Sequence, residues 1–135
     1  MTITADSTDL FPILRDMVAE CLGVEPEDVL PESHFFEDLG GESIDVIDLN
    51  YRVEKRLGLR SPFAAFASHE GWEFQPDGRL TEECRTRWEG RFPNLEWSKL
   101  DDPSGGQSPE RLMTIDTLHR LIQHALREQQ QPTNS

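Results

Sequence analysis

Residues 36–58 read FEDLGGESIDVIDLNYRVEKRLG, and they are the most informative part of the chain. A glycine pair precedes the apolar periodicity and Gly58 follows it, so the spacing predicts a helix from Ser43 to Leu57. At about 100° per residue, one side of this helix gathers core-type residues. These are Val46, Leu49, Val53 and Leu57, whereas a second apolar stripe on the other side holds Ile44, Ile47 and Tyr51.

The two apolar faces of this helix cannot both be explained by core packing, because a small bundle buries one face of a helix well and rarely two. The second stripe is bordered by Asp48 and Glu54, so we expect it to meet water. Leaving a branched apolar side chain exposed forfeits about 1.5–3 kcal/mol of burial free energy. An apolar stripe with an acidic rim is typical of a docking surface. The alternative is that the chain after Pro62 covers the stripe permanently.

Upstream, the sequence predicts a helix over residues 6–23, with Asp6, Ser7 or Thr8 as its cap and Gly23 as its end. Its apolar positions are Leu10, Leu14, Met17, Val18 and Cys21 or Leu22. Residues 24–42 lack periodicity, and we expect a long loop pinned to the core. Its apolar anchors are Val24, Val29, Leu30, Phe35, Phe36 and Leu39.

The character of the chain changes after Pro62. All three tryptophans follow (Trp72, Trp88 and Trp97), and one helix is predicted from a Thr81 cap to about Gly90. Residues 102–106 are typical of a flexible link. A last helix follows, starting at Ser108–Pro109 or at Thr114, with an apolar face of Leu118, Leu121, Ile122, Ala125 and Leu126. We expect the tail Gln129–Ser135 to be disordered.

The charge of this chain excludes several classes of partner. Its 135 residues contain 13 Lys and Arg against 26 Asp and Glu, a net charge of −13, whereas nucleic acids require a basic surface. No apolar run approaches the roughly 18 residues of a membrane span, so we expect no membrane insertion and a cytoplasmic protein. Residues 16–51 contain no Lys or Arg, and such an acidic field attracts basic partners.

The residue types and their spacing in the sequence match no catalytic or metal-binding pattern. Cys21 and Cys84 lack zinc-site spacing, and the four histidines are scattered, so we expect structural roles for them and no metal site. The loop before Ser43 lacks the lysine of a P-loop and the ligands of a calcium loop. It also lacks the second glycine of a nucleophile elbow. With no nucleophile–base set in view, we do not expect an enzyme.

Ser43 lies where the glycine loop meets the helix, and two roles are open to it. It is either a plain N-cap serine or the attachment point of an anionic group. A negative group on its hydroxyl would lie at the positive end of the helix, an interaction worth roughly 0.3–1 kcal/mol.

These residues resemble the acyl carrier protein family. The resemblance is carried by Val18–Val24, Glu27–Val29, Phe36–Asp45, Leu49 to Pro62, and Thr114 through Ile122, in matching order. The Asp-Ser-Leu signature of the family corresponds here to Glu42-Ser43-Ile44. The implied fold is all-α, an acyl-carrier-like four-helix bundle with a helix-containing insertion between the second and last helices. The 135 residues would form one carrier domain, with a core bundle at 8–62 and 109–128 and an insertion at 63–108.

The resemblance also implies a function. Ser43 would carry 4′-phosphopantetheine, transferred from coenzyme A by a holo-synthase (a phosphopantetheinyl transferase). The thiol of the cofactor would hold acyl groups as thioesters for fatty-acid, lipid or polyketide-type biosynthesis. Partner enzymes with basic patches would dock on the second helix and its approach. The matching positions are Asp38, Glu42, Ile44, Asp45, Ile47, Asp48, Tyr51 and Glu54. We expect a monomer.

Three positions and one region depart from the family pattern. Lys55 and Arg56 stand where fatty-acid carriers usually continue acidic, and Asn50 stands where an apolar residue is usual. The tryptophan-bearing insertion stands where ordinary members have a short linker with one short helix. Two alternatives to an acyl carrier stay open: an aminoacyl or peptidyl carrier, and an unmodified adaptor that binds partners through the acidic helix.

Overall fold

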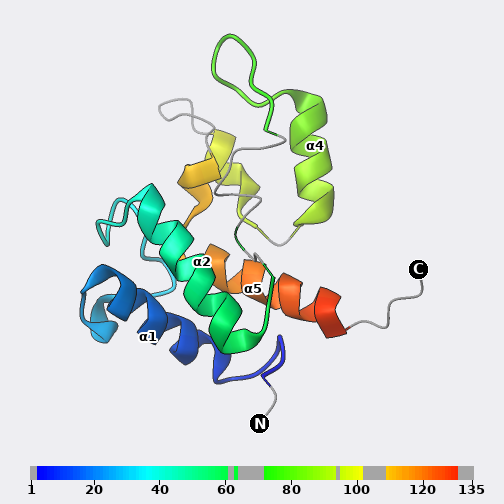
Figure 1. The fold of residues 1–135 in the computed structure, drawn as a ribbon. Coiled ribbons are helices and arrows are strands. Elements are labelled where there is room, and N and C mark those ends of the chain that lie inside the picture. The colour runs from blue at the N-terminus through cyan, green and yellow to red at the C-terminus, as the bar shows by residue number, and fades with distance from the viewer. Residues whose placement is uncertain (1–2, 61–62, 64–71, 94, 102–108, 131–135) are drawn as a thin grey trace.

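The computed structural model describes residues 3–60, 63, 72–93, 95–101 and 109–130 (Figure 1). Within these residues the chain forms four α-helices, three short 3-10 helices and two isolated bridges, which confirms the all-α class. The helices are α1 (Leu10–Leu22), η1 (Pro26–Asp28), α2 (Ser43–Leu57), α4 (Glu82–Arg91), η2 (Trp97–Asp101), η3 (Pro109–Leu112) and α5 (Ile115–Gln130). None of the helices in the described ranges is long and apolar enough to span a membrane.

Helix α1 is shorter at its start than the sequence predicted. Its N-cap is Asp9, so the expected caps at residues 6–8 are wrong. The chain there forms a turn in which the Ser7 amide donates to the Thr4 carbonyl at 3.1 Å, and the Ser7 hydroxyl accepts from the Asp9 amide at 3.3 Å. These local bonds compete with the helix. The predicted end is confirmed, because Gly23 adopts a φ of 68° and its amide donates to the Ala19 carbonyl.

Helix α5 uses both of its predicted starts. The short helix η3 comes first, and the Thr114 hydroxyl then accepts from the Thr117 amide at 3.2 Å to begin α5. The helix continues to Gln130, so Gln129 and Gln130 do not belong to a disordered tail as expected. The rest of that tail and the link at 102–106 lie outside the described residues.

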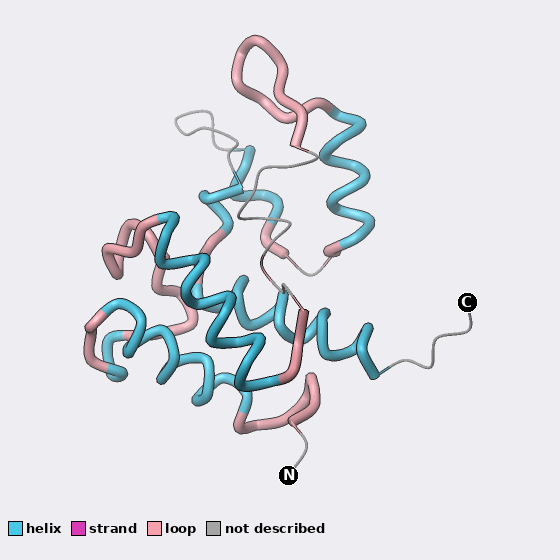
Figure 2. The backbone as a smooth tube through the Cα atoms, in the orientation of Figure 1, coloured by secondary structure: helices cyan, strands magenta, loops and turns pink. Residues whose placement is uncertain are grey.

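The core is formed where α1 contacts both α2 and α5 (Figures 1 and 2). Leu10, Leu14 and Val18 from α1 are fully buried, as are Leu49 and Val53 from α2. The loop at 24–42 is pinned as predicted by the buried side chains of Val29 and Phe35. Leu30 was expected to anchor the loop, but it is 48% exposed. A tight turn explains this difference, because the Leu30 and Ser33 backbones bond to each other at 3.0 Å and direct Leu30 outward.

Residues 72–93 and 95–101, which we call the tryptophan segment, contain α4 and η2 and stand apart from α1 and α2 in Figure 1. The Thr81 hydroxyl accepts from the Cys84 amide at 3.2 Å, which confirms the predicted cap. Trp72 and Trp88 stack with ring centroids 4.9 Å apart, and Trp97 lies 6.2 Å from Trp72. The Trp97 indole donates to the Phe92 carbonyl at 2.8 Å, so its buried polar atom is satisfied.

This aromatic cluster is continuous with the bundle core. Phe92 at the end of α4 lies 4.8 Å from the His124 ring of α5, centroid to centroid. Helices η2 and η3 also contact each other. The segment therefore packs on the last helix.

Candidate functional site

The approach to Ser43 is held by backbone pairing with the start of α5. The Phe35 amide donates to the Met113 carbonyl at 2.9 Å, and the Ile115 amide donates to the Ser33 carbonyl at 2.9 Å. His34 and Thr114 form the antiparallel bridge between these segments. The loop that carries the site is therefore tied to a helix 80 residues later in the chain.

The loop then folds back tightly on itself at the glycine pair. The Gly41 amide donates to the Phe35 carbonyl at 2.9 Å. A Cβ atom on residue 41 would lie 2.6 Å from the Cδ1 atom of Phe35, closer than real atoms approach. Gly40 has a φ of 73°, the left-handed region that favours glycine. Both glycines are thus needed for the turn that delivers the chain to α2.

Helix α2 begins without using the Ser43 hydroxyl. The N-cap is Glu42, which is extended, and its amide donates to the Asp45 carboxylate at 2.8 Å. Ser43 is the first helical residue and is exposed, and no described residue is shown hydrogen-bonding to its hydroxyl. The N-cap role that the sequence left open for Ser43 is therefore taken by its neighbour. The serine oxygen remains accessible at the positive end of a 15-residue helix.

The two faces predicted for α2 are both present. Val46, Leu49 and Val53 are buried, whereas Ile44, Ile47 and Tyr51 are 67%, 65% and 57% exposed. The prediction that the second stripe meets water is confirmed, and the described part of the chain after Pro62 does not cover it. The stripe starts next to Ser43 and runs along the helix away from it.

The acidic residues predicted for docking differ in how far they are already engaged. Glu42 is exposed, and so is Asp38, although the carboxylate of Asp38 accepts from the His34 amide at 2.7 Å. Asp45 and Asp48 are half-buried. Asp45 caps the helix, and Asp48 pairs with Arg52 at 3.3 Å. Glu54 is also half-buried and accepts from the Asn50 amide group at 3.2 Å. The Glu42 carboxylate accepts from the Asp45 backbone amide in the capping box, so every carboxylate of the predicted set also serves a local bond.

Asn50, which stood out from the family pattern, has a role that the sequence did not reveal. Its side-chain carbonyl accepts from the amide of Phe63 at 3.0 Å, while its amide group donates to Glu54. The Phe63 side chain is fully buried in the core. Asn50 therefore attaches the chain that leaves α2 to the helix itself. A polar residue at an otherwise apolar position was the available signal, but its partner 13 residues later could not be inferred.

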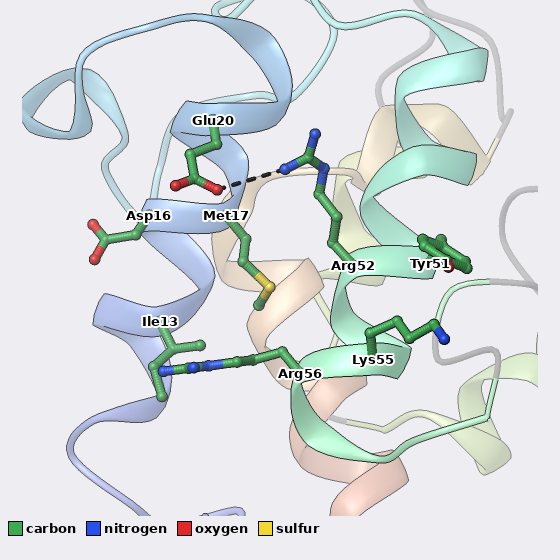
Figure 3. A pocket seen from close by; sticks show the side chains of 8 residues that line it. All are labelled: Ile13, Asp16, Met17, Glu20, Tyr51, Arg52, Lys55 and Arg56. Atoms are coloured by element: carbon green, nitrogen blue, oxygen red, sulfur yellow. Dashed lines mark ion pairs between the residues drawn. The ribbon is translucent and has the colours of Figure 1, made fainter.

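A groove of about 530 Å³ lies between α1 and α2 (Figure 3). Its α1 wall carries Asp16 and Glu20, its α2 wall carries Arg52, Lys55 and Arg56, and Ile13, Met17 and Tyr51 complete the lining. Arg52 reaches across it to within 3.5 Å of Glu20. The sequence did not predict this groove. Its three cations lie on α2, whose other half is acidic, so the sequence pattern indicated an acidic docking surface on this helix.

The cysteine near the site is held as a thiol. Burial, followed by the hydrogen bond to Asp48, raises the pKa of Cys21 from 9.0 to about 11. Its sulfur lies 3.4 Å from the Asp45 carbonyl. Cys21 is partly exposed rather than fully in the core, yet its raised pKa leaves little reactive thiolate near neutral pH.

The histidine next to α1 is likewise part of the packing. Burial lowers the pKa of His119, whose ring meets Phe11 edge-on with centroids 5.7 Å apart.

Residues 12–71 of the chain match the family described as a phosphopantetheine attachment site. It is 40% identical over 53 residues to an acyl carrier protein of Wolinella succinogenes, covering 39% of this chain and 70% of that protein. An acyl carrier protein of Bdellovibrio bacteriovorus is 36% identical over 53 residues, covering 39% and 68%. The acyl carrier protein AcpXL of Rhizobium meliloti is 34% identical over 55 residues, covering 41% and 58%.

The helical fold and the exposed serine at the start of an acid-rimmed helix define a carrier-type protein. The chain belongs to the acyl carrier protein family, as the resemblance predicted. Members of this family attach 4′-phosphopantetheine and act as carriers for other enzymes.

The residues around Ser43 fit such a group. The attachment oxygen is exposed and outside the capping network, so a phosphodiester on it would displace no described hydrogen bond. The negative phosphate would lie at the helix N-terminus, where backbone N–H groups favour an anion.

Proposed function

We propose that Ser43 is the residue that carries 4′-phosphopantetheine and that the protein works as a monomeric cytoplasmic acyl carrier. The observation that supports this assignment is the exposed Ser43 hydroxyl at the first position of α2, with capping done by Glu42 and Asp45 instead. The group supplies a terminal thiol on which an acyl chain is held as a thioester during biosynthesis of a fatty-acid, lipid or polyketide type.

The chain itself presents and orients the attachment oxygen. Gly41 and Phe35 fix the turn before it, and the pairing of residues 33–35 with 113–115 holds that turn on the bundle. A holo-synthase and later partner enzymes would then approach the same end of α2.

Docking would use the surface beside Ser43. The exposed stripe Ile44, Ile47 and Tyr51 offers apolar contact, and Glu42 offers an exposed carboxylate to a basic partner, although this carboxylate also belongs to the capping box of α2. Asp38, Asp45, Asp48 and Glu54 complete the proposed docking set, although their carboxylates also serve local bonds. The apolar contact is thus expected to supply affinity, and the acidic rim to supply steering.

The assignment is tested by intact-mass measurement after the chain is incubated with coenzyme A and a broad-specificity holo-synthase. We expect one pantetheine-sized mass increment in the wild type and in Ser7→Ala, and none in Ser43→Ala. Ser7 is the matched control because it also lies beside the start of a helix. An increment that persists in Ser43→Ala would assign the arm elsewhere, and an unmodified wild type would favour the adaptor alternative.

A further inference from the structure

Two exposed cations lie at the far end of the docking helix without an acidic partner. Lys55 and Arg56 have no carboxylate within ion-pair distance in the part of the chain that the structure describes. Lys55 continues the exposed stripe by one further turn, and its ammonium lies 5.4 Å from the centroid of the Tyr51 ring. In a chain with twice as many acids as bases, two neighbouring cations without a described acidic partner at this end of α2 require an explanation, Lys55 in line with the stripe and Arg56 beside it in the groove.

The two acids that line the groove with Lys55 and Arg56 are already engaged. Glu20 lies 3.5 Å from Arg52, and Asp16 lies 3.2 Å from Arg15. Figure 3 shows Arg52 directed toward Glu20, whereas Arg56 extends across the groove to Ile13. The charge of Arg52 is therefore offset within the protein, and the charges of Lys55 and Arg56 are available to a partner.

The surface of α2 consequently carries opposite charges at its two ends. Glu42 and Asp45 lie within two residues of Ser43, and Lys55 and Arg56 lie three turns later. At 1.5 Å per residue, Lys55 is about 18 Å along the helix from Ser43. This separation exceeds the roughly 8 Å Debye length at physiological salt, so a partner meets two distinct patches rather than an averaged charge.

We propose that Lys55 and Arg56 are specificity-determining residues for partner enzymes. They favour an enzyme whose surface is basic beside its active-site entrance and acidic about 18 Å away, a spacing set by the rise of the helix. They also repel an enzyme whose docking surface is basic along its whole length. This inference rests on the proposed function, because it assumes that partners reach Ser43 along α2.

A simpler role for the two cations is to complement the helix dipole at the C-terminal end of α2. That role would affect the stability of the helix and would leave the KM of a partner enzyme unchanged. The two roles are therefore separated by measuring KM and thermal stability on the same variants.

The test measures the kinetics of Ser43 modification with two forms of a broad-specificity holo-synthase. One form has a basic docking patch, and in the other the patch residues farthest from the active site are replaced by Glu. We expect the double change Lys55→Glu and Arg56→Glu to lower KM for the basic form by about three- to tenfold, with kcat unchanged. The same change should raise KM for the Glu-bearing form, and both effects should fade at about 0.5 M salt.

Arg60→Glu is the matched control, since Arg60 is also exposed and follows α2 but lies beyond its end. The neutral pair Lys55→Gln and Arg56→Gln should give a smaller shift of KM in the same direction, and it guards against misfolding caused by charge reversal. Circular dichroism checks that every variant stays helical.

A KM that moves no more than in Arg60→Glu would overturn the inference while Ser43 modification still proceeds, which leaves the proposed function intact. Loss of modification in every form of the chain would instead reject the proposed function, and the inference with it. The face is also self-complementary in an antiparallel pair, so sedimentation is measured in parallel. A wild-type dimer that the double charge reversal dissociates would assign this face to a second copy and overturn the inference.

Discussion

The pair α1–α2 and the tryptophan segment are stabilised in different ways. The helix pair buries aliphatic side chains such as Leu14 and Leu49 on one side and leaves an apolar stripe exposed on the other. The tryptophan segment turns its large rings inward, where Trp72 and Trp88 stack at 4.9 Å and each is less than 10% exposed.

Apolar surface therefore serves two purposes in one small chain. Exposed Ile44, Ile47 and Tyr51 contribute little to stability and are available for contact with other proteins. The aromatic cluster instead holds its own short elements together and packs against α5. We therefore propose that 63–108 is an inserted unit on a carrier core formed by 8–62 and 109–128.

The largest effect is expected from Trp88→Ala. Removing this ring from the stack should destabilise the tryptophan segment by about 3–5 kcal/mol, the usual cost of a large aromatic deletion. Because all three tryptophans lie in this segment, the fluorescence of Trp72 and Trp97 reports on its unfolding alone.

In this variant we expect the emission to shift to the red while Ser43 is still modified. Phe74→Ala is the control, since Phe74 is 43% exposed and its removal should change little. Loss of helicity and modification together with the emission shift would mean that both regions unfold as one cooperative unit.

A smaller effect is expected from Gly41→Ala. The added methyl group would press on the Phe35 ring and lie 2.9 Å from its carbonyl oxygen, so a loss of about 1–3 kcal/mol is expected. Modification of Ser43 should slow as well, because the turn delivers this serine to the helix.

Gly90→Ala makes the same change within α4 and has open space around it. It should stabilise the tryptophan segment by up to about 1 kcal/mol. Thermal melts of both variants measure the difference, and equal melting temperatures would contradict the crowding at residue 41.

Asn50→Leu should cost about 1–2 kcal/mol, because it leaves the Phe63 amide without its acceptor. Urea denaturation measures this loss. The control variant Glu54→Gln leaves the bond between Asn50 and Phe63 in place, so it should change stability by less than about 0.5 kcal/mol. If the two variants are equally stable, the Asn50–Phe63 bond does not hold the chain that leaves α2.

The smallest effect on stability is expected on the exposed stripe. Ile47→Ala and Tyr51→Ala should each change the free energy of unfolding by no more than about 0.5 kcal/mol. Val53→Ala on the buried face of the same helix should cost about 2 kcal/mol. The stripe variants should instead raise the KM of the holo-synthase. A stability loss as large as that of Val53→Ala would place the stripe in the interior.

Much of the carrier half was predictable from local patterns. The bounds of α2, its two faces and its closing glycine were all confirmed, because helical periodicity and glycine stops act over a few residues. The start of α1 and the role of Leu30 as a buried anchor were predicted wrongly. In both places short polar hydrogen bonds override the apolar pattern.

The sequence alone determined the family, the helical class and the serine at the head of an amphipathic, acid-rimmed helix, because these features are written in neighbouring residues. The folded chain was needed to show that Glu42 rather than Ser43 is the N-cap residue, that Asn50 binds Phe63, and that Lys55 and Arg56 have no acidic partner among the described residues. The reason is physical. Whether a side chain is exposed, capped or paired depends on atoms brought close by folding, and the spacing of residues along the chain does not specify those distances.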